Sequence, residues 1–236
     1  MAELLVQIDR GEIPVDVTRK KIKNLYIRVD RNDGRVRISA PRWMNDQELQ
    51  TAVRKHLRWI QRRQQVIALA PVREVARLRS GDIVTLFGES KRLEVVEGVA
   101  RQSACLEPSA VLTLYMRTGA EETDRRAVLD HWYRAQIRER IPALIDAWEQ
   151  VIGVTVAEWG VRRMRTRWGS CNIQARRIWL NLELAQRPPE CLEYVVVHEM
   201  VHLLERGHNR RFYSLMDQFL PGWQVQRAAL NASPPK

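Results

Sequence analysis

Two histidines and a glutamate near the C-terminus have the residue types and the spacing of a zinc site. His198, Glu199 and His202 form an H-E-x-x-H motif. Residues four apart lie on one face of a helix, so the two imidazoles can bind one zinc ion while Glu199 points toward the open coordination position. The motif would arise by chance in about one sequence in a hundred of this composition. It therefore favours a zinc site over two unrelated histidines beside a solvated glutamate.

A third ligand is expected downstream, because a catalytic zinc usually takes three protein ligands and leaves the fourth position to water. After Glu205 the only acidic residue is Asp217, which excludes a downstream glutamate of the thermolysin type. His208 follows His202 by six residues, and Gly207 is expected to adopt the left-handed conformation that ends the helix and turns the chain back. The alternative is that His208 caps the last helix. The spacing predicts that His208 completes a three-histidine zinc site.

Such a site would catalyse hydrolysis. Zinc lowers the pKa of a bound water toward 7, and Glu199 would take its proton and deliver it to the leaving group. A carboxylate, Asp217 or Glu205, is expected to accept a hydrogen bond from a zinc-binding histidine. Three groups are candidates for stabilising the oxyanion: Tyr213, His131 and an arginine of residues 162–167.

The second half of the chain supplies elements that can hold this site. Pro188 and Pro189 suit the first turn of the helix that carries the histidines, and Asn209 can cap a last helix over residues 210–219. Upstream, apolar spacing predicts a long helix over residues 125–150, with a kink or break at Pro142. Strands are expected over residues 154–159 and 177–182.

The first half of the chain is predicted to be mostly sheet. Alternating apolar residues indicate antiparallel strands around residues 15–17, 25–29 and 36–38, with a hairpin turn at residues 32–34. Asn45 or Asp46 can cap one long basic helix that reaches Leu69. Further short strands are expected at residues 83–87, 93–96 and 111–115. The sequence therefore predicts an α+β protein with a β-rich region over residues 1–118 and a metal-binding catalytic domain over residues 119–236.

Composition and charge narrow the class of protein. The chain has 236 residues, of which 45% are hydrophobic and 28% charged, as in folded soluble proteins. It shows no basic, apolar secretory start and no membrane-spanning stretch, and its three cysteines are too few for a disulfide framework. A cytoplasmic protein without a membrane partner is expected.

The formal net charge of +11 is concentrated between Arg19 and Arg63, where 14 Lys and Arg face four acidic residues. This region would attract nucleic acid or another polyanion, and the alternative is a solvated basic face. Its densest part is the outer face of the predicted basic helix. The nucleic-acid hypothesis assigns binding to Arg58, Arg62 and Arg63.

Several motifs together resemble the YgjP-like metallopeptidase family. They are the R-W-G-S-C run of residues 167–171, W-L-N-L at 179–182, the Pro188-Pro189 pair, Y-V-V-V-H-E at 194–199 and the segment from His208 to Tyr213, with further likeness near the N-terminus, including V-R-I-S-A-P at 36–41. Met200 and Asn209-Arg210 depart from the family pattern, which has leucine and Ser-Pro there. Neither departure touches a predicted ligand.

The resemblance implies a minimal zincin core, similar to that of SprT and WLM domains, in which the edge strand of a short antiparallel sheet pairs with an extended polypeptide substrate. Residues 177–182 are expected to be that edge. Residues 168–171, including Trp168 and Ser170, would either shape the substrate side of the cleft or form a turn whose tryptophan packs in the core. Tyr213 is a further expected contact to the substrate or transition state.

Three functions remain open. The first is a zinc metallopeptidase. The second is a metal-dependent hydrolase of nucleotide phosphoanhydrides, a pyrophosphatase, although no glycine-rich phosphate loop supports it. The third is a DNA-associated protease recruited by the basic N-terminal region.

Overall fold

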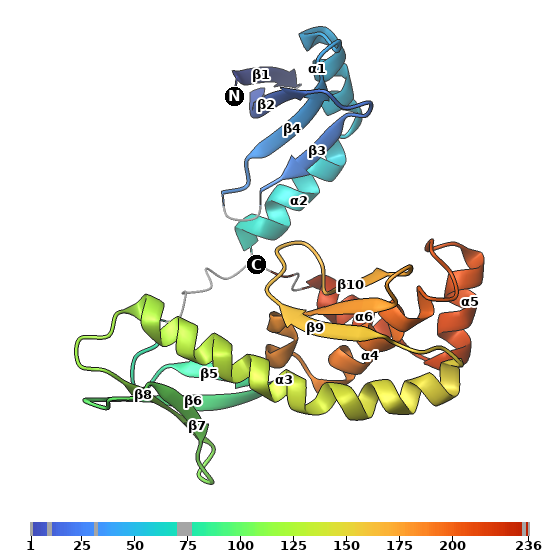
Figure 1. Ribbon diagram of the computed structural model, residues 1–236. Helices are drawn as coiled ribbons and strands as arrows, with labels where there is room; N and C mark the ends of the chain where they lie inside the picture. The colour runs from blue at the N-terminus through green and yellow to red at the C-terminus, as the bar shows by residue number, and fades with distance from the viewer. Residues whose placement is uncertain (1, 9–10, 31–32, 70–76, 233–234, 236) are drawn as a thin grey trace. The chain divides into compact units, whose positions relative to one another are not determined.

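The computed structural model describes residues 2–8, 11–30, 33–69, 77–232 and 235 (Figure 1). The chain divides into two compact units, Met1–Val75 and Ala76–Lys236. The mixed α+β class agrees with the sequence-based prediction. The division between the units differs from the expected one at residues 118 and 119, because the middle strands of the chain belong to the second unit.

The first unit contains a four-stranded sheet in the order β1-β2-β4-β3. Its strands are β1 (Ala2–Ile8), β2 (Gly11–Lys20), β3 (Tyr26–Val29) and β4 (Val36–Pro41). The expected β3–β4 hairpin is present, and Asn32 of its predicted turn lies outside the described residues. The prediction of a wholly antiparallel region was wrong, because β2 pairs with β4 in parallel. A parallel pair of this kind needs a crossover connection, which strand alternation does not reveal.

The expected single basic helix is two helices, α1 (Asp46–Lys55) and α2 (Leu57–Leu69), which are separated at His56. Asn45 caps α1 as predicted: its side chain accepts a hydrogen bond from the Glu48 N–H, and the Glu48 carboxylate accepts one from the Asn45 N–H, both at 2.8 Å. Side chains from β2, β4, α1 and α2, among them Ile38, Leu49 and Ile60, form a separate hydrophobic core.

The second unit begins with a four-stranded sheet in the order β5-β6-β8-β7. Its strands are β5 (Ile83–Leu86), β6 (Glu89–Glu97), β7 (Ser103–Leu106) and β8 (Val111–Met116). The long helix α3 (Glu122–Ile152) follows and continues through Pro142, so the helix does not break there. Pro142 is exposed. The Tyr133 hydroxyl donates a 2.8 Å hydrogen bond to the carbonyl of Thr85 and joins α3 to β5.

A three-stranded sheet and a group of helices complete the second unit. The elements are β9 (Glu158–Arg162), β10 (Gly169–Asn172), β11 (Arg177–Asn181), the 3-10 helix η1 (Leu182–Gln186), α4 (Pro189–Val201), α5 (Arg210–Phe219) and α6 (Gln224–Ala232). β11 pairs antiparallel with β10 and parallel with β9. The expected strand over residues 154–159 begins later, at Glu158.

The prediction that residues 177–182 form the edge of this sheet was therefore wrong. β11 is the central strand, and β10 lies at the edge beside it. Residues 168–171 were expected to shape the cleft or to form a turn, and most of them instead belong to the strand β10.

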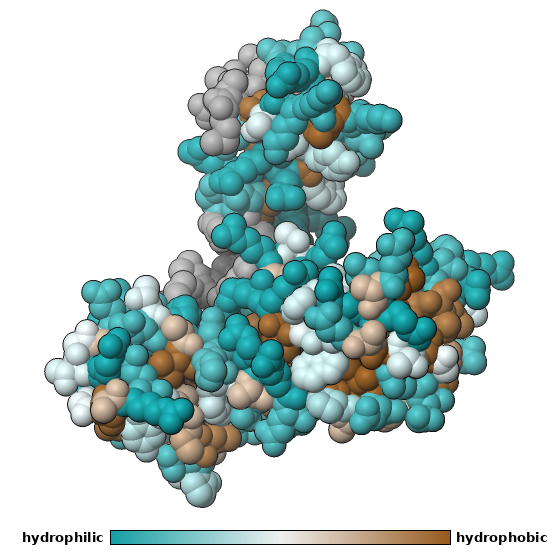
Figure 2. All heavy atoms as spheres, in the orientation of Figure 1, coloured by the Kyte–Doolittle hydropathy of each residue, from teal (hydrophilic) through white to brown (hydrophobic). Residues whose placement is uncertain are grey.

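Within the described part of the chain, no helix is both long enough and apolar enough to cross a bilayer. Hydrophilic residues cover most of the face shown in Figure 2, and apolar residues gather in patches on the second unit.

Candidate metal centre

Helix α4 holds the metal motif rigidly because it is buried on almost every side. Pro188 is its N-cap and Pro189 its first residue, as the sequence predicted. Val196, Val197 and Met200 are fully buried around the motif. The buried helix fixes the direction of the two histidines and of the glutamate between them.

His208 reaches the same place through the loop between α4 and α5. The helix ends at Val201, and the next residues form a further turn in which the Glu205 N–H donates to the Val201 carbonyl at 3.0 Å. The Glu205 side chain then accepts a 3.3 Å hydrogen bond from the Gly207 N–H. Gly207 is absent from the described glycines with positive φ, so the expected left-handed turn is wrong. Glu205 orders the return of the chain instead.

The three histidines converge at one point, where each offers a ligand nitrogen and these atoms all lie within 4.8 Å of one another. The Nε2 atoms of His198 and His208 are 2.9 Å apart. Tetrahedral zinc with Zn–N bonds of about 2.0–2.1 Å would separate its ligand nitrogens by about 3.4 Å, so the donor set fits zinc after small adjustments. Asn209 caps α5 through a 3.0 Å hydrogen bond from the Phe212 N–H, which leaves His208 free of the capping role.

Neighbouring groups orient two of the imidazoles. The Nδ1 atom of His202 lies 3.1 Å from the backbone carbonyl of Glu205, and the Tyr194 hydroxyl lies 3.5 Å from Nδ1 of His198. Such partners fix the ring and leave Nε2 for a metal. The carboxylate of Asp217 accepts hydrogen bonds from Trp223 at 2.8 Å and Gln224 at 3.0 Å, so its expected role beside a histidine is wrong. Glu205 contacts His202 through its backbone carbonyl and not through the carboxylate that was expected to accept the hydrogen bond.

Burial lowers the pKa of all three histidines, which favours the neutral form that binds metals. Burial, followed by repulsion from His202 and His208, lowers the pKa of His198 to about 3. Burial also lowers the pKa of His202, and the nearby Glu205 carbonyl opposes the shift. The pKa of His208 is lowered by burial and then by His202.

Glu199 is almost completely buried beside the triad, with 5% of its surface exposed. Burial raises its pKa to about 8, and the charge of Arg167 acts in the opposite direction. Gly169 lies directly against this carboxylate: a Cβ at Gly169 would overlap Glu199 Oε1 and lie 2.7 Å from its Cγ. The close packing requires glycine at the first residue of β10.

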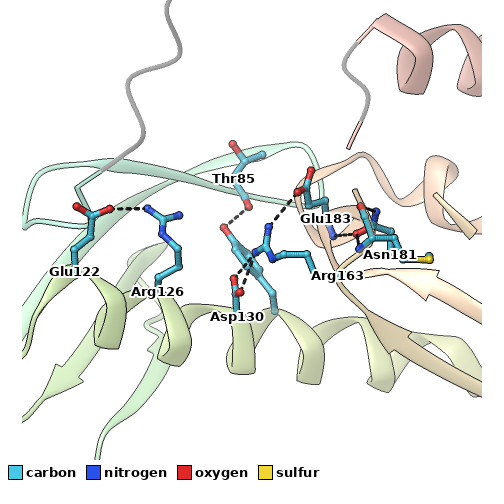
Figure 3. Close-up of polar contacts among 9 residues, drawn as sticks. Thr85, Glu122, Arg126, Asp130, Arg163, Asn181 and Glu183 are labelled. Carbon is cyan, nitrogen blue, oxygen red and sulfur yellow. Dashed lines mark hydrogen bonds and ion pairs between the residues drawn. The ribbon is translucent and has the colours of Figure 1, made fainter. Parts of the chain in front are cut away.

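A buried asparagine, Asn181, holds the loop before β10 (Figure 3). Its amide group donates 2.7 Å hydrogen bonds to the carbonyls of Met164 and Arg167. Its side-chain oxygen accepts from the Glu183 N–H at 3.1 Å. Asn181 thus places Arg167 and the start of β10 against Glu199.

Arg163 anchors the same loop to the rest of the unit (Figure 3). It contacts both carboxylate oxygens of Asp130 on α3, at 2.8 and 2.9 Å, and Glu183 at 3.1 Å. An arginine of residues 162–167 was a predicted oxyanion contact. Arg163 is instead engaged in these ion pairs, and among the loop arginines only Arg167 lines the cavity described next.

A cavity of about 1100 Å³ opens over the histidines and Glu199. The residues predicted to contact substrate, Trp168, Ser170 and Tyr213, all line it. His131 is exposed on α3 and is not among the lining residues, so it is not in position to stabilise an oxyanion there.

The far wall of the cavity includes residues that sequence reasoning missed. Trp223 stacks between Tyr194 and Tyr213, with ring centroids 6.0 and 5.6 Å apart and interplanar angles of 4° and 8°. Arg227 of α6 lies over Tyr213 and Trp223, with its guanidinium carbon 5.5 and 5.4 Å from the two ring centroids. Arg206 also lines the cavity. The helical spacing of Trp223, Arg227 and Leu230 was the available signal for α6.

The arginines assigned to nucleic acid lie elsewhere. Arg58, Arg62 and Arg63 belong to α2 in the first unit, where Arg58 and Arg62 are exposed and Arg63 is half-buried.

Comparison with known proteins agrees with the motifs. No curated protein matches the chain significantly. The family model described as the YgjP-like metallopeptidase domain matches residues 23–233, which include both the basic helices and the histidines. The chain therefore belongs to the YgjP-like metallopeptidase-domain family.

Proposed function

We propose that the protein is a zinc-dependent peptidase in which His198, His202 and His208 bind the metal and Glu199 is the general base. The observation that supports this best is the convergence of three imidazole nitrogens within 4.8 Å beside a buried carboxyl group. Membership of a metallopeptidase family supports metal-dependent hydrolysis independently.

Glu199 performs the proton transfers in this proposal. Zinc, when bound, supplies Lewis-acid activation of water and of the scissile carbonyl. The Glu199 carboxylate accepts the proton of the attacking water and returns it to the leaving amine. Burial raises the pKa of this carboxyl group, whereas Arg167 and the positive charge of a bound zinc act in the opposite direction and favour the carboxylate that the base role requires. The burial that raises the pKa also excludes competing water.

The free edge of β10 supports a polypeptide substrate. The Asn181 N–H donates to the Trp168 carbonyl at 2.8 Å, which makes these residues a hydrogen-bonded pair of the β10–β11 ladder. Because paired and unpaired residues alternate along an antiparallel strand, Gly169 and Cys171 direct their backbone N–H and carbonyl groups to the outer edge. An extended peptide can pair with this edge next to Glu199.

The test is cleavage of an unstructured polypeptide by the zinc-loaded protein. We expect Glu199→Gln to reduce the rate roughly 10²–10⁴-fold while the zinc content stays unchanged, because the base is lost and the ligands remain. Glu190→Gln, at an exposed position in the first turn of the same helix, is the matched control and should cleave like the wild type. Cleavage that is absent, or unaffected by Glu199→Gln, would contradict the proposal.

A second candidate, hydrolysis of nucleotide phosphoanhydrides, is favoured by the charge of the cavity. Arg167, Arg206 and Arg227 line it, and among the described lining residues Glu199 is the only acid. Three guanidinium groups beside the histidines would hold polyphosphate oxygens. Release of phosphate or pyrophosphate from nucleoside triphosphates, lost in Glu199→Gln and weakened in Arg227→Ala, would favour this candidate over the peptidase.

A further inference from the structure

We propose that the outer face of α2, formed by Arg58, Trp59, Arg62, Arg63 and Val66, binds single-stranded nucleic acid. This surface, called the α2 basic face below, belongs to the first unit alone. The inference does not rest on the hydrolytic activity of the second unit.

The geometry of α2 gathers these side chains on one side. At 100° per residue, positions 58, 59, 62, 63 and 66 fall within an arc of about 140°. The opposite side carries the residues that pack into the core of the unit, of which Ile60 is fully buried, with Leu57 and Ile67 partly buried. The helix is therefore amphipathic, and its core side is already occupied.

Within the described part of the first unit, the charge of the α2 basic face has no acidic partner. The sequence contains no acidic residue between Glu48 and Glu74. Among the described residues, no carboxylate lies within 4.0 Å of Arg58, Arg62 or Arg63. Elsewhere in the same unit arginines are paired: Arg19 meets Asp46 at 2.6 Å, and Arg37 has three acidic neighbours at 3.1–3.8 Å.

Exposed apolar side chains lie among these arginines. Trp59 is 50% exposed and Val66 is 53% exposed. Arginines that meet phosphates, combined with an aromatic ring on which a base can stack, are the elements of single-strand recognition. Paired bases in a duplex keep their faces covered, so a stacking tryptophan favours an unpaired strand.

Two other partners fit this surface less well. A helix that lies in a membrane interface inserts its apolar side, and the apolar side of α2 is buried against its own sheet. An acidic polypeptide would satisfy the arginines but has no bases to stack on Trp59. The face from Arg58 to Val66 is about 12 Å long, enough for its three arginines to meet one phosphate each along a single strand.

The experiment measures binding of the full-length protein to a fluorescent 12-nucleotide oligothymidylate by anisotropy, at several salt concentrations. We expect the triple variant R58A/R62A/R63A to bind more weakly and to make the slope of log K against log salt less negative by about 2, the value for three lost phosphate contacts. We expect Trp59→Ala to weaken binding about tenfold and Trp59→Phe to retain most of it.

The control R92A/R101A/R117A removes the same charge from exposed positions of the second unit. It should bind the oligonucleotide like the wild type. Equal loss in this control would show a general charge effect and overturn the proposal. The proposal would also fail if Trp59→Ala changed nothing, or if duplex DNA, a polyglutamate peptide or phosphatidylserine vesicles bound more tightly than the single strand.

Discussion

Two glycines near the metal centre differ in what an added methyl group would meet. At Gly169 a Cβ would overlap the Glu199 carboxylate, whereas at Gly207 no heavy atom lies within 4 Å of the added carbon. The requirement for glycine therefore lies at the edge strand and not at the turn before His208.

Gly169→Ala is expected to lower kcat/KM about 10²-fold because it displaces the general base, with little change in zinc content. Gly207→Ala is the matched control and should keep both activity and zinc near wild-type levels. Steady-state kinetics and metal analysis of the two variants check this prediction. Equal effects of the two substitutions would count against the geometry at Gly169.

The thiol of Cys171 lines the same cavity and should be slow to react. Burial, followed by the charge of Glu199, raises its pKa to about 11. The reactive thiolate is therefore a minor species at pH 8, and alkylation should accelerate about tenfold for each pH unit up to this pKa. Mass spectrometry of iodoacetamide-treated protein across pH 7–10 measures the rate, and a rate independent of pH would contradict the prediction.

At the scale of single residues, the sequence predicted what depends on local spacing. The positions of His198, Glu199 and His202 follow from helical periodicity, which needs no tertiary information. The role of Gly207 was wrong because several backbone paths can bring His208 back. The close approach of Gly169 to Glu199 joins residues thirty positions apart and has no local signal.

The next scale is that of the elements, and here the loop between β9 and β10 depends on one buried side chain. Asn181 binds the carbonyls of Met164 and Arg167 and accepts from the Glu183 N–H. Its removal leaves several buried backbone groups without partners.

Asn181→Ala is expected to lower the free energy of unfolding of the second unit by about 2–4 kcal/mol and to reduce activity, since Arg167 and β10 lose their anchor. Asn172→Ala is the control: Asn172 is exposed and its side chain accepts one hydrogen bond, from the Ala175 N–H at 3.0 Å. Urea unfolding measures the loss of unfolding free energy in both variants. A smaller loss in Asn181→Ala than in Asn172→Ala would refute the anchoring role.

The sequence predicted the helices of the second unit better than its strand pairing. α5 begins and ends where the apolar spacing and Asn209 indicated. β10, with four residues that include Gly, Ser and Asn, lacks the β-branched and aromatic residues that mark a strand. Its place at the edge depends on pairing with β11, which periodicity within a strand does not specify.

At the scale of the whole molecule, two separate hydrophobic cores define the organisation. One core lies within the first unit and the other within the second. The sequence-based division at residues 118 and 119 followed the change from strands to a long helix. The boundary between the units instead follows the two cores, because β8 and α3 contribute side chains to the same core.

We expect the protein to unfold in two thermal transitions. Zinc should raise the midpoint temperature of only one of them, that of the second unit. A ligand at 1,000 times its Kd stabilises the unit that binds it by about 4 kcal/mol. Leu49→Ala, in the core of the first unit, should lower the other transition without changing the effect of zinc. Calorimetry with and without a chelator measures the two transitions. A single transition that responds both to zinc removal and to Leu49→Ala would contradict the prediction that the two units unfold independently.

The most direct test of the central claim is the zinc content of the purified protein beside His208→Ala. Three histidines converge on one point, so we expect one zinc per wild-type chain and a clear loss of zinc in the variant. Full zinc occupancy in His208→Ala would contradict the three-histidine centre.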